Sequence, residues 1–281
     1  MGSDSQWRLL CVTVPQQDSE VVSDYLWSRG VAAIEEIDKG DFTELRTSYG
    51  NELDELSADV STRFPQVVIE ELGVFRDIAD TWRDFAAPVV VDATLRIVPS
   101  WREERFNDDD DETVTNVLID PEDVFGLGNH PTTVGALRLA RKYAPHHSSV
   151  LDFGSGSGVL AIAMAKTHHC VVSAFDIADN SQEVISRNAE RNNVHVSWID
   201  LSSEQPLNIN HSYDVILANI LAPVLCDIAP VVKQLSKTGT LIVLAGMRDD
   251  QWENVRDQYR WCGINESISI EGWISVCLRA S

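Results

Sequence analysis

The chain has 281 residues, of which 44% are hydrophobic and 23% are charged, proportions typical of a folded globular protein. Its 44 acidic and 22 basic residues give a net charge of −22, which disfavours direct binding to nucleic acid and favours a basic protein partner. No apolar run reaches the roughly 20 residues that span a bilayer, and Met1–Gln6 lacks a signal-peptide pattern, so we expect a cytoplasmic protein that contacts no membrane.

The cysteines and histidines follow no metal-binding pattern. The five cysteines are scattered without a CxxC pair, and the doublets His146–His147 and His168–His169 have no patterned partner. We therefore expect no metal site and no disulfide framework. The acidic run Asp108–Asp111 is interpreted as a solvated loop, because it lacks the alternating ligands of a calcium loop. The acidity of the whole chain also fits simple solubility, and charge alone does not decide between solubility and a basic partner.

The first 73 residues predict a small α+β domain. Strand-like and helix-like stretches follow in the order β-α-β-β-α-β, which is the order of a ferredoxin-like fold. The predicted elements are Trp7–Val14, Asp18–Arg29, Ala32–Ile37, Phe42–Tyr49, Asn51–Phe64 and Val67–Leu72. This segment has no catalytic pattern, so we interpret residues 1–73 as a substrate-recognition domain. Residues 74–98 then predict a linker with a helix at Phe75–Phe85 and one strand at Val89–Val98.

From residue 99 to residue 281 the pattern changes to apolar strands that alternate with helices, which predicts an α/β domain with a parallel sheet covered on both faces. The predicted strands are Val150–Phe153, Val171–Asp176, Val194–Ile199, Tyr213–Asn219 and Thr240–Leu244, and the predicted helices include Gly158–Lys166, Ser181–Asn192 and Asp249–Trp261. Two last strands, Glu266–Ile270 and Trp273–Leu278, are joined by two residues only and must form an antiparallel hairpin. A doubly wound sheet that ends in such a hairpin resembles the class I methyltransferase architecture.

A glycine-rich turn follows the first predicted strand of this domain. It has the pattern Asp-x-Gly-x-Gly-x-Gly from Asp152 to Gly158, with Gly154 and Gly156 inside the turn. Such turns let the backbone approach a cofactor at the carboxyl end of a strand, although NAD and FAD sites use similar ones. The carboxylate of Asp152 suits the cationic amino group of a methionine moiety and would repel a pyrophosphate. This favours S-adenosylmethionine as the cofactor.

Polar side chains also end the following strands. Asp176 ends the second strand, where a carboxylate can accept hydrogen bonds from both ribose hydroxyls. The alternative role, a helix N-cap, fits Asp179 or Ser181 better. Asp200 follows the third strand and either reaches the adenine amino group or lies in a plain surface turn.

An asparagine and a loop complete the candidate site. Asn219 ends the fourth strand, where its amide can position an incoming amine, or it forms a turn. Upstream, the loop Phe125–Thr133 leads into a helix that continues to Tyr143, and its glycines and its place before the sheet suggest a flap over the cofactor. Thr132 or Thr133 can instead serve as the cap of that helix.

Together these segments resemble the PrmA family, the bacterial methyltransferases of large-subunit ribosomal protein eleven. The resemblance rests on the loop Phe125–Thr133, the turn Asp152–Gly158 and the stretch Ala218–Leu221. The segments Trp82–Phe85 and Pro99–Arg102 also resemble the linker region of that family. It implies that Thr133, Gly154, Asp176 and Asn219 contact S-adenosylmethionine, and that Asn219 and the loop frame the amine. In that family the amines are lysine side chains and the N-terminal amino group. Leu127 stands where the family has Thr, and Ile78 where it has Trp.

The implied reaction needs positioning more than acid–base chemistry. A neutral amine held in line with an activated methyl group gains most of its rate from proximity and orientation. Burial beside a cationic cofactor lowers the pKa of a lysine from its ordinary value of about 10.4, so we assign Asn219 a catalytic positioning role and name no general base. Two other functions remain open: methylation of a different protein lysine or a small amine, and cofactor binding without catalysis.

Overall fold

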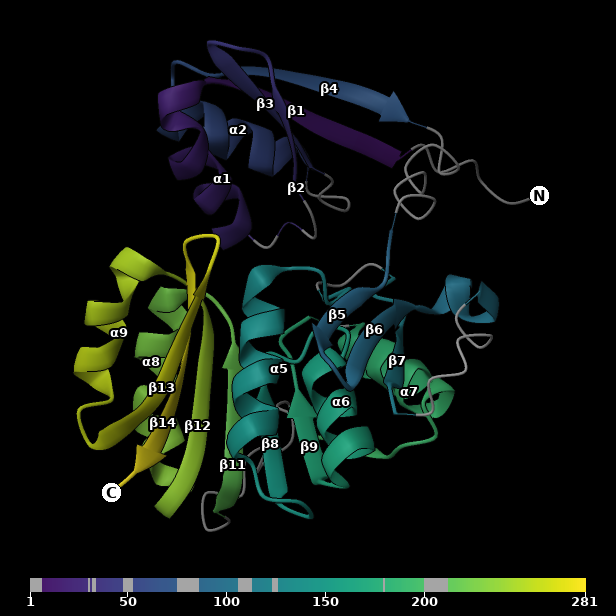
Figure 1. Cartoon of the computed structure of the whole chain (residues 1–281). Helices are drawn as coiled ribbons and strands as arrows, with labels where there is room; N and C mark the ends of the chain where they lie inside the picture. Colours follow the sequence, from purple (N-terminus) through teal and green to yellow (C-terminus); the bar gives the residue numbers. More distant parts are fainter. Residues whose placement is uncertain are drawn as a thin grey trace. The chain divides into compact units, whose positions relative to one another are not determined.

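The computed structural model describes residues 7–29, 31, 34–47, 53–74, 86–105, 113–122, 126–178, 180–199 and 212–281. Contacts divide the chain into two compact units, Met1–Ala86 and Ala87–Ser281 (Figure 1). The division falls inside the segment 74–98 that the sequence assigns to a linker. The predicted helix Phe75–Phe85 and the acidic run Asp108–Asp111 lie outside the described residues.

The first unit is a four-stranded antiparallel sheet with two helices. Its elements are β1 (Trp7–Pro15), α1 (Ser19–Ser28), β2 (Ile34–Asp38), β3 (Phe42–Thr47), α2 (Leu53–Arg63) and β4 (Val68–Val74), with a 3-10 turn at Gln16–Asp18. The strand order β2-β3-β1-β4 is that of a ferredoxin-like fold, as the sequence predicts. Alternate residues of β1, such as Leu10 and Val12, pack against Leu26 and Leu56 of the helices, so both helices cover one face of the sheet.

The second unit is built on a seven-stranded sheet of order β10-β9-β8-β11-β12-β14-β13. Its strands are β8 (Ser149–Phe153), β9 (Val171–Phe175), β10 (Val196–Trp198), β11 (Tyr213–Asn219), β12 (Ser236–Arg248), β13 (Cys262–Ile270) and β14 (Trp273–Ala280). The strands from β10 to β12 are parallel, whereas β14 runs antiparallel to β12 and β13. The predicted hairpin is confirmed: Glu271 and Gly272 have φ of 54° and 77°, as a two-residue hairpin turn requires.

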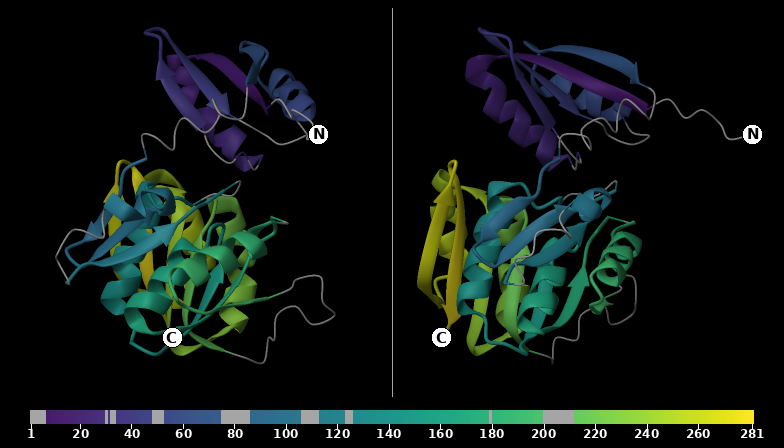
Figure 2. Two further views of the ribbon diagram at one scale, coloured as in Figure 1. Left: turned by 90° about the vertical axis from the view of Figure 1, so that its right-hand side faces the viewer. Right: turned by 45° about the vertical axis from the view of Figure 1, so that its right-hand side comes forward.

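Helices cover both faces of this sheet (Figure 2). The helices α5 (Pro131–Tyr143), α6 (Val159–His168) and α7 (Ser181–Arg191) pack on one face, and α8 (Ala222–Gln234) and α9 (Trp252–Gln258) on the other. Successive residues of β8 divide between the two cores, with Val150 in the first and Leu151 in the second. The predicted doubly wound sheet is therefore confirmed. Among the described residues, no helix is long and apolar enough to cross a membrane.

A small third sheet differs from the sequence prediction. It contains β5 (Val89–Asp92), β6 (Leu95–Pro99) and β7 (Thr115–Ile119), with the 3-10 helix Ser100–Arg105 after β6. The single strand predicted at Val89–Val98 is wrong, because the carboxylate of Asp92 accepts a hydrogen bond from the amide of Thr94 at 2.8 Å and makes a tight turn there. The strand β7 was not predicted. It runs parallel to β6 and packs against α6 and α7.

Candidate functional site

The glycine-rich turn lies between the carboxyl ends of β8 and β9. Gly154, Gly156 and Gly158 have φ of 67°, 51° and 81°, a region that favours glycine. The amide of Gly154 donates to the carbonyl of Phe175 at 3.1 Å, so the turn wraps over the end of β9. A Cβ atom on Gly154 would lie 2.4 Å from Cγ2 of Ile220, and no other residue fits there without displacing Ile220. Gly154 and Gly156 remain only half-buried, so a ligand can reach their backbone.

Asp176 reaches the same turn from the end of β9. Its Oδ2 accepts a hydrogen bond from the amide of Gly156 at 2.7 Å, and its Oδ1 accepts one from the amide of Ala178 at 2.9 Å. A carboxylate has about four acceptor positions, so two remain for a ligand. The side chain is half-buried at the edge of the turn. The predicted pair of a glycine turn and a strand-end acid is thus brought together.

Asp152 lies behind the turn and is only 1% exposed. Its Oδ2 accepts a hydrogen bond from the amide of Ala161 in the first turns of α6 at 3.2 Å. Its Oδ1 is buried with no hydrogen-bond partner among the described residues. Burial, together with the nearby charge of Asp176, raises the pKa of Asp152 to about 7. The group therefore sits between its neutral and ionised forms at physiological pH, where a cation beside it would favour the ionised form.

Asn219 and Thr133 meet at the end of β11. The Nδ2 of Asn219 donates to Oγ1 of Thr133 at 3.2 Å, and Thr133 is fully buried in the first turn of α5. This bond joins two residues that are 86 positions apart in the chain. It leaves the Oδ1 of Asn219 as an acceptor at the half-buried end of the strand. The two predicted residues are thus in direct contact.

The cap of α5 differs from the prediction. The N-cap is His130 rather than Thr132 or Thr133, and its Nδ1 accepts a hydrogen bond from the amide of Thr132 at 3.4 Å. Burial, assisted by the charge of Arg248, lowers the pKa of His130 to about 4. The imidazole is therefore neutral at physiological pH, which keeps Nδ1 able to accept. Histidine was not among the caps expected from the sequence, because Ser, Thr, Asp and Asn are the usual caps.

The loop before α5 contacts the glycine turn. Ser157 Oγ donates to the carbonyl of Gly126 at 2.5 Å, and a Cβ atom on Gly126 would lie 2.7 Å from that Oγ. A Cβ atom on Gly128 would lie 2.8 Å from Cγ2 of Ile97. With φ of 116° and 99°, both positions also favour glycine for conformational reasons. Leu127 lies between them and is half-buried, whereas Phe125 lies outside the described residues.

Several residues of this region were missed by the sequence analysis. A Cβ atom on Gly246 would lie 2.4 Å from the backbone oxygen of Ile220, a close approach that a lone glycine inside a strand can signal. Trp273 packs edge-to-face on His130 with ring centroids 4.7 Å apart, and the guanidinium of Arg248 lies 4.3 Å from its ring centroid. Asn188 of α7 bonds to the glycine turn, and no local signal distinguishes it from a surface asparagine. Asp179 and Asp200 lie outside the described residues.

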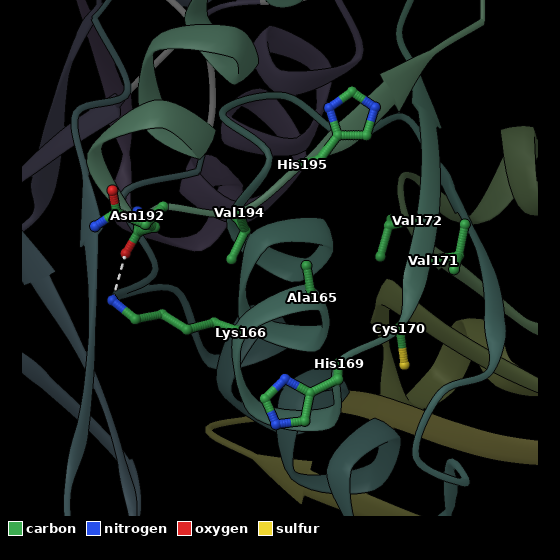
Figure 3. A pocket seen from close by; sticks show the side chains of 10 residues that line it. Ala165, Lys166, His169, Cys170, Val171, Val172, Asn192, Val194 and His195 are labelled. Carbon is green, nitrogen blue, oxygen red and sulfur yellow. Dashed lines mark hydrogen bonds between the residues drawn. The ribbon is translucent and has the colours of Figure 1, made fainter.

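The opposite end of the sheet carries a cavity of about 400 Å³ and none of the predicted site residues (Figure 3). It is lined by residues around the starts of β9 and β10, including Lys166, Val172, Val194 and His195. The two histidine doublets lie at the same end: His146 stacks on His168 and His147 on His169, at 4.6 and 5.7 Å between ring centroids. Within the described ranges, no three His, Cys, Asp or Glu side chains are placed to hold a metal ion.

The strand order, the antiparallel last pair and the glycine turn between the first two strands define a class I methyltransferase fold. A family profile described as "Ribosomal protein L11 methyltransferase (PrmA)" matches residues 42–281. The chain belongs to the PrmA family.

Individual relatives agree with this assignment. A ribosomal protein L11 methyltransferase from Shewanella sp. (strain W3-18-1) is 35% identical over 200 residues, covering 70% of this chain and 66% of the relative. One from Dictyoglomus turgidum is 29% identical, covering 80% and 74%. The crystal structure of a ribosomal protein L11 methylase from Lactobacillus delbrueckii subsp. bulgaricus superposes with a TM-score of 0.62 at 25% identity, over 70% of this chain and 100% of that one. The chain thus spans just under two thirds of the length of the Shewanella relative.

Proposed function

We propose that this protein transfers methyl groups from S-adenosylmethionine to lysine side chains and the N-terminal amine of ribosomal protein L11. The observation that carries the proposal is the contact of Asp176 with the Gly156 amide at 2.7 Å, at the same carboxyl edge of the sheet as the Asn219–Thr133 bond, in a chain of the PrmA family. A turn that accepts a nucleoside and an amide that can hold an amine then lie at the same edge of the sheet. The target is a ribosomal protein, so we expect the reaction in the cytoplasm. Because this chain has a net charge of −22, we expect it to bind ribosomal protein L11 and not ribosomal RNA.

The residues of the site fit S-adenosylmethionine. The buried oxygen of Asp152 that lacks a partner among the described residues suits the ammonium group of the methionine moiety. The half-buried backbone of Gly154 and Gly156 gives room for that moiety, and a side chain at Gly154 would collide with Ile220. The spare acceptor positions of Asp176 suit the two ribose hydroxyls. When bound, the cofactor supplies a methyl group already activated on a sulfonium.

The protein's own contribution is to hold the amine. The Nδ2 of Asn219 is committed to Thr133, so its Oδ1 is the atom that can accept from the incoming amine. An amine aimed by this oxygen gains rate from orientation. Loss of water around the amine lowers its pKa, and the departing proton goes to solvent before the nitrogen attacks. The Thr133 bond therefore matters because it fixes the rotation of the Asn219 amide.

The first unit supports a basic protein as the acceptor. The face of its sheet that points away from α1 and α2 carries Glu35, Glu44 and Glu70, with Arg46 paired to Glu44 at 2.5 Å and to Glu35 at 3.6 Å. Phe42 and Val68 are 49% and 58% exposed on the same face. Acidic groups around exposed apolar side chains suit a basic protein surface. We therefore propose that residues 1–73 are a substrate-recognition domain, as the sequence predicts.

Intact-mass spectrometry tests the proposal directly. Unmodified ribosomal protein L11 is incubated with the protein and S-adenosylmethionine, and we expect mass gains in steps of one methyl group that are absent with Asp176→Ala. An Asn219→Asp variant is expected to bind the cofactor and to transfer methyl groups more slowly, because the amide no longer donates to Thr133 as it does at 3.2 Å. Unchanged turnover in that variant would contradict the role of Asn219. Cofactor binding with no mass gain on L11 would contradict the acceptor and direct the search to other basic proteins.

A further inference from the structure

Asn188 joins three segments of the second unit. It is fully buried on α7. Its Oδ1 accepts from the amide of Asp120 at 3.0 Å, and its Nδ2 donates to the carbonyl of Asp120 at 2.9 Å. The same Nδ2 donates to the carbonyl of Ser157 in the glycine turn at 3.0 Å. One amide thus connects α7, the chain just after β7 and the candidate cofactor site.

Ser157 in turn bonds to the loop before α5. Its side chain is fully buried, and its Oγ donates to the carbonyl of Gly126 at 2.5 Å. The residue is therefore held on both sides, by Asn188 at its carbonyl and by Gly126 at its hydroxyl. Its neighbours Gly156 and Gly158 are glycines with positive φ, a backbone that has many other accessible conformations. The two bonds hold the turn in one conformation in the free protein. Less conformational freedom is then lost when a ligand binds, which favours binding.

Asn192, four residues after Asn188 and at the C-cap of α7, provides a natural comparison. Its Oδ1 accepts from the amide of Leu118 at 2.9 Å, and its Nδ2 donates to the carbonyl of Leu118 at 2.7 Å. It is also buried, and its Oδ1 accepts from Lys166 at 3.1 Å, as drawn in Figure 3. The two asparagines thus hold alternate residues of the same chain segment with the same pair of bonds. Of the two, Asn188 is the one that bonds to the glycine turn.

We propose that Asn188 is a positioning residue for the cofactor, acting through Ser157. The two bonds of Ser157 hold the glycine turn and the loop at Gly126 in their binding conformation before the cofactor arrives. Asn192, by contrast, has a structural role: it holds Leu118 of β7 and, among the described residues, makes no bond to the glycine turn. The identity of the ligand rests on the proposed function, so S-adenosylmethionine is the probe.

Titration calorimetry with S-adenosylmethionine, beside thermal unfolding, compares Asn188→Ala with Asn192→Ala. Each variant loses the same two bonds to one residue of the segment, so we expect similar losses of Tm, on the order of 5 °C. We expect the Kd for S-adenosylmethionine to rise about tenfold in Asn188→Ala, the change that corresponds to one lost buried hydrogen bond, and less than about twofold in Asn192→Ala. In turnover assays the KM for S-adenosylmethionine should rise in Asn188→Ala with kcat nearly unchanged.

Ser157→Ala keeps the proposal testable if Asn188→Ala does not fold. It removes one hydroxyl and its bond to Gly126, and we expect a rise in Kd of about threefold with little loss of Tm. Equal Kd changes in the two asparagine variants would overturn the proposal, as would an unchanged Kd in Ser157→Ala. If the unaltered protein itself does not bind S-adenosylmethionine, the proposed function fails instead, so the two failures are distinct.

Discussion

Two aspartates on neighbouring parallel strands, Asp152 on β8 and Asp214 on β11, lie at opposite ends of the same sheet. Asp214 accepts hydrogen bonds from the amide and hydroxyl of Ser149 at 2.9 and 2.8 Å, and pairs with Lys237 at 2.7 Å. The bonds to Lys237 and Ser149 lower its pKa to about 2. Asp152 has no cation beside it in the described part of the chain, and burial raises its pKa to about 7.

The difference separates a structural carboxylate from one that suits a ligand. A carboxylate whose partners are already in place lowers the energy of the fold and has little to gain from a ligand. A buried carboxylate with an oxygen that lacks a partner costs folding energy, which a cationic ligand can offset. The glycine turn, Asp176 and Asn219 gather at the end where Asp152 lies, which is why we expect the cofactor there.

The largest effect should come from Asp176→Ala. The substitution removes the bond to the Gly156 amide and the spare acceptors for the ribose, so we expect the Kd for S-adenosylmethionine to rise about a hundredfold, as for two charge-assisted hydrogen bonds. Calorimetry measures the Kd, and circular dichroism checks that the fold is kept. A change below about threefold would show that the carboxyl end of β9 does not hold the ribose.

A pH dependence should follow for Asp152. Its pKa of about 7 in the free protein must fall when a cation binds beside it, so protons are released on binding. We expect affinity for S-adenosylmethionine to increase as pH rises from about 5.5 to 7, by up to about tenfold per pH unit. Asp152→Asn should bind more weakly and without this slope. The same slope in Asp152→Asn would assign the titration to another group.

A smaller effect, on stability alone, is expected for Asp214→Asn. The side chain of Asp214 is 38% exposed, so we expect its bonds to Lys237 and Ser149 to contribute about 1 kcal/mol to the free energy of unfolding at pH 7. Because the folded pKa is below the unfolded one, this contribution is present above about pH 4 and is lost as pH falls toward 2. Urea titrations of the variant and the unaltered protein at pH 7 and at about pH 2.5 measure it, and the difference between the two proteins should shrink at the lower pH. An altered Kd for S-adenosylmethionine in this variant would contradict the view that Asp214, at the amino end of the sheet, has a structural role only.

The smallest effect should come from the cavity at the amino end of the sheet. His195 is exposed at its edge and contacts Ser197 at 3.3 Å. We expect His195→Ala to leave Tm nearly unchanged and to change the Kd for S-adenosylmethionine by less than about twofold. The same calorimetric titration measures it, with the unaltered protein alongside. A marked loss of affinity would mean that this end of the sheet also takes part in binding.

Much of this organisation was predictable because it is local. The pair Glu271-Gly272 predicts its hairpin, since two residues cannot cross a sheet. The turn from Asp152 to Gly158 predicts its place between a strand and a helix, since glycine spacing and apolar periodicity lie within one short segment. The split between β5 and β6 was missed because Asp92 turns the chain without a glycine or proline. The five residues of β7 were missed because so short a stretch gives little periodicity.

The sequence by itself determined most of the order of strands and helices, apart from β5 to β7, and which polar residues end the main strands, because periodicity and turn chemistry depend on neighbours in the chain. Only the tertiary structure decided which of those polar groups found partners. Asp152 and Asp214 look alike as residues at strand ends. Asp214, however, pairs with Lys237, which comes from a different strand, β12. Asn188 and Asn192 likewise look alike on one helix, and the bond to Ser157, 31 residues away in the chain, distinguishes them. Burial and pairing are set by segments that meet only on folding, and that is where the chemistry of this site is decided.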